Sequence, residues 1–329
     1  MDWKNKTVLI TGAEGFIGSH LTERLLSLGA KVKALVMYNS FNRWGWIDTF
    51  PSGEVNKLNV ICGDVREADI LKAALKDVDI VFHLAALIAI PYSYASPSSY
   101  VKTNIEGTLN LLQTALDSGV EKFLHTSTSE VYGTAVYVPI DEKHPLQGQS
   151  PYSASKIGAD MIAESFYRSF GLPVTTLRPF NTYGPRQSMR AIIPTLIVQM
   201  INGNKVQLGS LHPVRDFTYV TDTVEGFITV AETDGIHGEV INIGSANGIS
   251  IGELAKKLIK VMGRNANIEC KEKRVRPSKS EVNRLICNNQ KAKELIGWQP
   301  KVSLDEGLEK TINWFKENLK EYKSKLYNI

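Results

Sequence analysis

Tyr152 and Lys156 stand four residues apart and form the pair in this chain best suited to proton chemistry. They lie in the run SPYSASK at the start of a helical pattern, so both side chains share one face of the helix. A tyrosine is a useful base only if its pKa falls from about 10 towards neutrality, and a neighbouring ammonium group lowers it in this way. We therefore expect Tyr152 to act as a base whose pKa is lowered by Lys156.

Hydroxyl groups and a carboxylate follow directly after an apolar segment, in residues 125–133 (HTSTSEVYG). Thr128 could hydrogen-bond the substrate hydroxyl that Tyr152 deprotonates. Glu130 is unnecessary for simple alcohol oxidation, but once a ketone has formed, the adjacent C–H is acidic and needs a general base. A solvated loop position is the alternative interpretation of Glu130.

A glycine-rich turn, residues 11–18 (TGAEGFIG), comes after the first apolar run and opens a helix. Gly12, Gly15 and Gly18 permit a tight turn with close backbone approach, and the helix start at Phe16 and Ile17 offers free N–H groups to a pyrophosphate. Such a turn can be purely structural, but its place in a β-α-β pattern predicts that it binds NAD or NADP.

The second strand ends without the carboxylate that usually binds the adenosine ribose of NAD, since residues 36–40 read VMYNS. Its absence favours NADP, whose 2′-phosphate Asn39, Ser40 and Arg43 could contact. The alternative is NAD held by a different ribose partner. After the third strand, Asp64 could accept a hydrogen bond from the adenine amine, or it could cap the next helix.

Short apolar runs alternate with helical patterns through the first half of the chain. We expect strands at residues 6–11, 31–37, 58–61, 79–83, 122–126 and 174–177, with helices at 16–28, 67–75, 98–117 and 152–170. This alternation predicts an α/β fold, a doubly wound, Rossmann-like parallel sheet covered on both faces. From about Tyr183 the β-α-β pattern stops, which predicts a dinucleotide-binding domain at 1–182 and a smaller α/β substrate lobe at 183–329, with segments that can interleave.

The composition argues against several other classes of protein. Net charge is only +4 with scattered basic residues, so we expect no nucleic-acid partner. The most apolar stretch, residues 80–90, is too short to span a bilayer. Cys62, Cys270 and Cys287 are odd in number and lack C-x-x-C spacing, which disfavours disulfides and a zinc site and predicts a cytoplasmic protein without a metal.

Over essentially its whole length the sequence resembles the extended short-chain dehydrogenases/reductases that act on nucleotide sugars. The resemblance is carried by TGAEGFIG, HLAA at 83–86, Asn104, the Tyr152/Lys156 pair, RPFNTYGPR at 178–186, RDF at 215–217 and RP at 276–277. It implies cofactor contacts at Val65, Leu84, Ala85, Ala86 and Asn104, substrate contacts at Asn181, Arg186, Arg215 and Arg276, and a homodimer formed through the helices around Asn104 and Tyr152.

Within that family the triplet Thr128-Ser129-Glu130 resembles that of sugar-nucleotide 4,6-dehydratases, although UDP-glucuronate decarboxylases share its serine form. Residues 38–46 and 178–194 are most similar to the dehydratases of bacterial legionaminic acid synthesis, which convert N-acetylglucosamine carried on UDP or GDP. This resemblance implies that Tyr152 takes the C4 hydroxyl proton as hydride leaves for the nicotinamide. Glu130 then removes the C5 proton, water leaves C6, and the hydride returns to C6.

Ser129 stands where some dehydratases carry an aspartic acid, so either Ser129 or Glu130 must protonate the leaving hydroxyl. Three other functions remain open at this stage. A 4-epimerase needs Tyr152 and Thr128 but no carboxylate at position 130, a decarboxylase needs a uronic acid, and a non-catalytic NAD(P) sensor needs neither Tyr152 nor Lys156.

Overall fold

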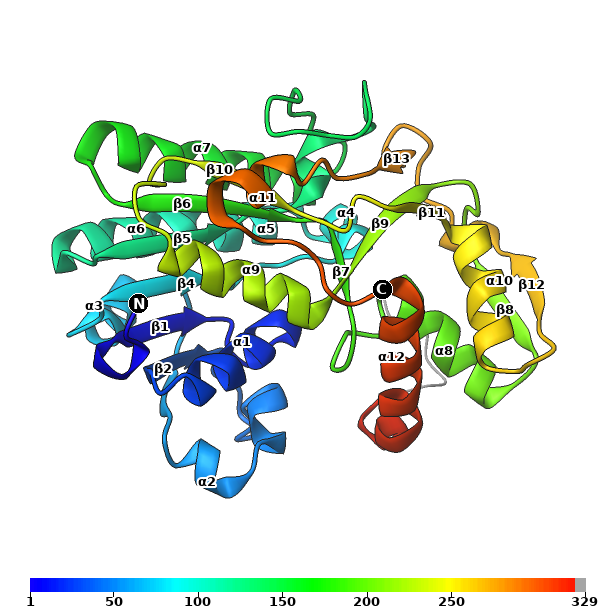
Figure 1. Ribbon diagram of the computed structural model, residues 1–329, viewed down its shortest axis with the longest axis horizontal. Coiled ribbons are helices and arrows are strands. Elements are labelled where there is room, and N and C mark those ends of the chain that lie inside the picture. The colour runs from blue at the N-terminus through cyan, green and yellow to red at the C-terminus, as the bar shows by residue number, and fades with distance from the viewer. Residues whose placement is uncertain (323–329) are drawn as a thin grey trace.

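The large sheet contains seven parallel strands in the order β10-β6-β5-β4-β1-β2-β3 (Figure 1). The computed structural model describes residues 1–322. The strands are β1 (Thr7–Thr11), β2 (Lys31–Val36), β3 (Asn59–Cys62), β4 (Ile80–His83), β5 (Lys122–Thr126), β6 (Val174–Pro179) and β10 (Val240–Ile243). The predicted doubly wound parallel sheet is therefore confirmed.

The inner strands β1, β4, β5 and β6 bury both of their faces, because side chains alternate between two helical layers. Val8 and Ile10 face a layer formed by α1 (Phe16–Ser27) and α9 (Val220–Glu232). Leu9 faces the opposite layer, formed by α3 (Ala68–Leu75), α6 (Gly107–Ser118) and α7 (Pro151–Phe170). This double burial explains why the strands read as continuous apolar runs in the sequence.

The expectation that the β-α-β pattern ends near Tyr183 was wrong. Helix α9 packs on the large sheet, and β10 then pairs in parallel with β6, with Val240 opposite Thr176. The pattern was hidden because β7 (Asn181–Tyr183), α8 (Ile192–Asn202), β8 (Lys205–Leu208) and β9 (Val214–Tyr219) intervene in the sequence. Residues 220–243 therefore return to the large sheet, and the two parts of the chain interleave.

The smaller lobe, on the right in Figure 1, includes β8, β9, β11, β12, α8 and α10. One sheet has the order β11-β9-β13, with β7 also paired to β9, and a second pairs β12 with β8. The elements not yet given are β11 (Gly248–Ser250), α10 (Ile251–Val261), β12 (Asn267–Cys270), β13 (Arg284–Leu285), α11 (Gln290–Ile296) and α12 (Leu304–Asn318).

The helix predicted at 98–117 is three segments: α5 (Pro97–Tyr100), a π-helical stretch η3 (Val101–Glu106) and α6. Short elements elsewhere are α2 (Ser52–Val55), α4 (Ile90–Ala95) and the 3-10 turns η1 (Trp3–Asn5), η2 (Gly45–Thr49), η4 (Ser129–Tyr132), η5 (Glu272–Arg274) and η6 (Leu319–Glu321). Within residues 1–322, no helix has the length and apolar character that crossing a membrane requires.

Candidate active site

The glycine-rich turn joins β1 to α1 at the carboxyl edge of the large sheet. Gly12 has φ +69°, and a Cβ added there would lie 3.0 Å from the backbone of Ala85. A Cβ on Gly18 would collide with the carbonyl oxygen of Gly12. Gly15 is the N-cap of α1, and no side chain caps this helix, so the N–H groups at Phe16 and Ile17 face the turn. This geometry is compatible with a pyrophosphate at the turn, which stays a prediction.

The segment after β4 is bonded to the same turn. The N–H groups of Leu84 and Ala85 both donate to Thr11 Oγ1, at 3.2 and 3.1 Å. Thr11 also contacts His83 Nδ1 at 2.8 Å, and His83 Nε2 lies 2.9 Å from Thr108 Oγ1. These bonds bring Leu84, Ala85 and the following Ala86 beside the glycines, where the sequence expected them.

Asn104 supports this segment from the π-helical stretch. Its Nδ2 donates to the Leu87 carbonyl and to Ser155 Oγ, both at 2.9 Å, and its Oδ1 accepts from Leu87 N–H at 2.8 Å. Because protein groups use both ends of this buried amide, Asn104 joins the loop after β4 to α7 and does not itself reach for the cofactor.

The residues expected to hold a 2′-phosphate are not arranged to do so. Asn39 Nδ2 donates to the Arg43 carbonyl at 2.7 Å, and its Oδ1 accepts from Phe41 N–H at 3.1 Å. Asn39 therefore shapes its own loop, while Ser40 and Arg43 are exposed. The contacts of Asn39 therefore give no support to a preference for NADP.

Asp64 does not cap a helix, because the N-cap of α3 is Glu67. Its carboxylate forms a two-pronged ion pair with Arg66, at 3.0 and 2.6 Å, and this pair lowers the pKa of Asp64. The next residue, Val65, is buried against Gly107, where an added Cβ would lie 2.7 Å from Val65 Cγ2. Both residues stay at the end of β3, where the sequence placed them.

Thr128, Ser129 and Glu130 lie where β5 ends and the short turn η4 begins. Thr128 is the N-cap of η4, and its Oγ1 accepts from Glu130 N–H at 3.2 Å. Ser129 and Glu130 are both buried, so the interpretation of Glu130 as a solvated loop residue is wrong. Tyr152, in the first turn of α7, is close enough to Thr128 and Glu130 for both to act on its pKa. The structure thus brings together the hydroxyl groups and the carboxylate expected to act on a substrate.

The expected effect of Lys156 on Tyr152 is not seen. Burial raises the pKa of Tyr152 above its ordinary value and nearby Glu130 adds to this, outweighing the opposite effect of Thr128. Lys156 Nζ instead donates to the Thr126 carbonyl at 2.6 Å, and burial lowers the pKa of Lys156 to about 8. Without a bound nicotinamide, whose positive charge was expected to help, Lys156 does not lower the pKa of Tyr152, because desolvation dominates at this buried position.

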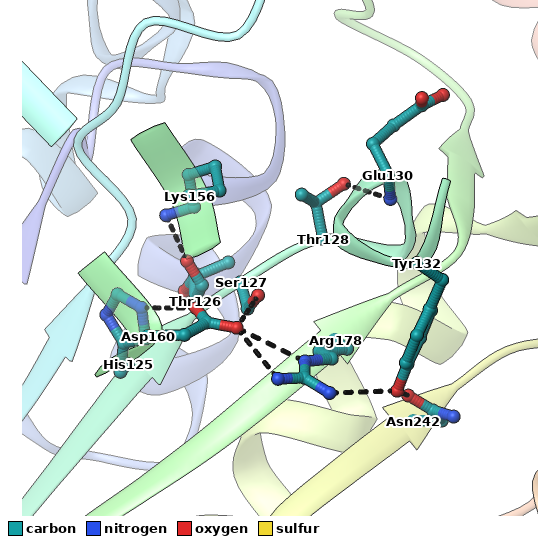
Figure 2. A network of polar contacts seen from close by, with 10 residues as sticks. All are labelled: His125, Thr126, Ser127, Thr128, Glu130, Tyr132, Lys156, Asp160, Arg178 and Asn242. Carbon is teal, nitrogen blue, oxygen red and sulfur yellow. Dashed lines mark hydrogen bonds and ion pairs between the residues drawn. The ribbon is translucent and has the colours of Figure 1, made fainter. Parts of the chain in front are cut away.

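A buried polar network beneath the site was missed by the sequence analysis (Figure 2). The carboxylate of Asp160 accepts from Ser127 Oγ at 2.7 Å and from Arg178 Nε and Nη2 at 3.2 and 3.0 Å, and it contacts His125 Nε2 at 3.0 Å. Burial alone would raise the pKa of Asp160, but His125 and Arg178 hold it below its usual value. Asp160 is four residues after Lys156, on the same helix face, which was the available signal.

The network continues from Arg178 into the last strand of the large sheet. Arg178 Nη1 donates to Tyr132 Oη at 3.1 Å, and Tyr132 Oη donates to Asn242 Oδ1 at 2.7 Å. Asn242 belongs to β10, so the network ties η4 and α7 to the strand that the sequence analysis left out. In Figure 2 the Glu130 side chain points away from this network.

Arg215 and Arg276 converge on the carboxylate of Glu281. Their guanidinium groups share the carboxylate of Glu281, at 3.5 and 3.7 Å, and Glu130 also acts electrostatically on the buried Arg215. Arg276 Nη1 is buried without a hydrogen-bond partner, as is the Oδ1 atom of Asn181. Arg276 Nη1 is the atom that faces Glu281 at 3.7 Å, so this contact is an ion pair without a hydrogen bond, and guanidinium groups of this kind suit a diphosphate.

Arg186 lies elsewhere. Its two terminal nitrogens bond to the carboxylate of Glu23 on α1 at 2.7 and 2.9 Å, and its guanidinium lies 5.3 Å from the centre of the Phe50 ring. This ion pair holds the segment after β7 against α1, an arrangement that argues against the predicted substrate contact. Sequence similarity could not distinguish the two roles.

A family model for GDP-mannose 4,6-dehydratase matches residues 9–311 of the chain. A dTDP-glucose 4,6-dehydratase from Streptomyces antibioticus is 32% identical over 316 residues, which cover 94% of this chain and 92% of that relative. The match therefore spans both the glycine turn and the substrate lobe.

Solved structures agree on the fold. A UDP-glucose 4-epimerase from Thermotoga maritima, solved with UDP-glucose, has a TM-score of 0.86 at 33% identity over 95% of this chain and 99% of its own. TunA, an NAD-dependent NDP-hexosamine 5,6-dehydratase of tunicamycin biosynthesis, has a TM-score of 0.84 at 29% identity, with coverages of 95% and 98%. The enzyme class predicted from the sequence is confirmed at the family level: this chain belongs to the GDP-mannose 4,6-dehydratase family.

Proposed function

We propose that this chain converts UDP- or GDP-N-acetylglucosamine to the 4-keto-6-deoxy sugar nucleotide, as a 4,6-dehydratase. The position of Glu130 carries the proposal. Its buried carboxylate acts electrostatically on both Tyr152 and Arg215. A carboxylate is therefore near both the base at C4 and an arginine suited to the diphosphate, and a 4-epimerase does not need one at this position.

The residues have distinct parts in this reaction. A bound oxidised nicotinamide would accept the hydride from C4, return it to C6 after water has left, and supply a positive charge. Tyr152 takes the C4 hydroxyl proton while Thr128 holds the same hydroxyl, and the raised pKa of Tyr152 makes that positive charge necessary. Glu130 removes the C5 proton, which the C4 ketone has made acidic, and Ser129 or Glu130 protonates the hydroxyl that leaves C6.

The identity of the sugar, N-acetylglucosamine, is the more specific part of the proposal. It rests on the similarity of residues 38–46 and 178–194 to dehydratases of legionaminic acid synthesis, and on the likeness to the hexosamine dehydratase TunA.

We also propose a cytoplasmic homodimer. Free cysteines at 62, 270 and 287 suit a reducing compartment, and Leu109, Met161 and Phe170 leave apolar surface exposed on α6 and α7.

The test is incubation with each of the two sugar nucleotides in D2O, followed by mass spectrometry and proton NMR. Loss of one water with deuterium at C5 of a 4-keto product is expected, and the nucleotide that reacts identifies the carrier. A C4 epimer of unchanged composition would instead make the chain an epimerase. A product with a C5–C6 double bond would assign it the 5,6-dehydratase reaction.

Glu130→Gln separates the two halves of the reaction. It is expected to lower turnover by about 10²–10⁴-fold, the usual contribution of a general base, while C4 oxidation still reduces the bound nicotinamide. Glu164→Gln, an acid on the outer face of α7 paired with Arg168, is the matched control and should keep turnover within about twofold of wild type. Full turnover in Glu130→Gln would refute the proposed role.

A further inference from the structure

Glu14, inside the glycine-rich turn, places a carboxylate at the end of β2. Its Oε1 accepts a hydrogen bond from the N–H of Met37 at 2.9 Å, and Met37 directly follows the last residue of that strand. The backbone of the turn is bonded there too, since Gly12 N–H donates to the Leu35 carbonyl at 3.1 Å. An acid at this edge normally comes from the end of β2 itself and binds the adenosine ribose of NAD.

The loop at residues 38–46 covers Glu14. The N–H of Trp46 donates to the Glu14 carbonyl at 3.1 Å. Gly45 has φ +56°, and a Cβ there would lie 2.8 Å from the Glu14 carbonyl oxygen and 3.0 Å from Glu14 Cβ, so only glycine allows this approach. The Trp46 ring packs on Trp314 of α12, with ring centres 5.4 Å apart, which fixes this end of the loop.

The second carboxylate oxygen of Glu14 is left without a partner. Oε2 is buried and accepts no hydrogen bond from any residue in the described part of the chain. Burial raises the pKa of Glu14, which shows that the carboxylate is desolvated without full compensation. An ionised group in this position needs a donor, and a ribose hydroxyl is one.

A 2′-phosphate would meet the opposite conditions at this edge. It would bring two further negative charges to a buried carboxylate and would have no proton to donate to Oε2 at neutral pH. The Asn39 amide, which the sequence suggested as its ligand, is already used within the loop.

From this geometry we infer that Glu14 binds the adenosine ribose hydroxyls of the cofactor and makes the enzyme select NAD over NADP. The inference rests on the proposed function only in requiring that the chain bind a nicotinamide dinucleotide. The glycine-rich turn would then supply both the pyrophosphate site and the ribose-binding acid that β2 lacks.

The test is calorimetric titration of cofactor-free protein with NAD and with NADP, which needs no turnover. Wild type should bind NAD at least roughly 100-fold more tightly. Glu14→Gln keeps the size of the side chain and removes its charge. It should weaken NAD binding by about 10-fold or more, and it should lower the ratio of NAD affinity to NADP affinity by at least as much. Asp69→Asn removes one fully exposed charge from α3 and should leave the ratio within about twofold of wild type.

Three results would overturn the inference. They are a wild-type preference for NADP, a ratio that Glu14→Gln leaves unchanged, and a ratio that Asp69→Asn shrinks equally. Binding of neither dinucleotide would refute the proposed function as well, so the two failures can be told apart. If Glu14→Gln does not fold, 2′-deoxy-NAD tests the wild type directly, and affinity within about twofold of NAD would exclude the ribose contact.

Discussion

Replacing Asp160 by asparagine removes the carboxylate at the centre of the network in Figure 2. Asp160 and Arg178 are each about 3% exposed, so neither charge can turn to water. The neutral side chain would keep its shape but lose the ion pair with Arg178. The guanidinium would then lack its counter-ion, although Tyr132 would still hold it through the 3.1 Å hydrogen bond and a ring whose centre lies 5.1 Å away.

The size of the loss follows from burial. Removing one partner of a buried ion pair typically costs about 3–5 kcal/mol, because the other charge stays buried without its counter-ion. The four contacts of Asp160 are too strongly coupled to be summed one by one. We therefore expect Asp160→Asn to lower the free energy of unfolding by about 3–5 kcal/mol.

Asp160 also acts on Lys156. Burial lowers the pKa of Lys156 to about 8, and the negative charge of Asp160 opposes that fall. Without the carboxylate the pKa of Lys156 falls further, so the ammonium form is lost at lower pH. If that form is required for turnover, the alkaline limb of the pH–rate profile should move to lower pH in Asp160→Asn.

Urea denaturation at pH 7 measures the stability change, provided the denaturant slope is the same in both proteins. Asp234→Asn is the matched control. It also removes the carboxylate partner of a buried cation, Lys122, but the Asp234 side chain itself is 91% exposed. A pair with so exposed a partner should contribute little to stability, because solvent screens it. If Asp160→Asn costs no more than Asp234→Asn, the reasoning from burial is refuted.

Two further predictions concern the contacts of α1. Arg186→Ala should lower the free energy of unfolding by about 1–2 kcal/mol, because it removes the ion pair with Glu23. The KM for the sugar nucleotide should not change. A tenfold rise in KM would show instead that Arg186 contacts the substrate. Burial lowers the pKa of His20 to about 4, below the value of about 6.5 in an unfolded chain, so the unfolded state binds more protons between these values. The contribution of His20 to the free energy of unfolding should therefore fall by at most about 3 kcal/mol as pH drops from 6.5 to 4. His20→Gln should make stability depend less on pH in this range. The same pH dependence in both proteins would contradict the lowered pKa of His20.

The sequence by itself determined the parts of this protein that depend on local pattern and on one topological rule. Glycine spacing after an apolar run predicted the turn at Gly12, because only glycine accepts its backbone geometry and the close approach of the β4 segment. Parallel strands present their carboxyl ends at one edge, so residues following different strands could be expected to meet there. Thr128, Glu130 and Tyr152 do meet, although 24 positions separate Thr128 from Tyr152 along the chain.

Only the tertiary structure decided which charges are paired, which are buried and which face each other. Arg186 matches a family motif, yet its partner is Glu23 from the first helix. Lys156 bonds to a carbonyl of β5, and burial outweighs its effect on Tyr152. The acid missing from the end of β2 is replaced there by Glu14, from another element. Hydrogen bonds and desolvation depend on side-chain positions within a few ångströms, and chain folding brings together residues that sequence spacing cannot relate.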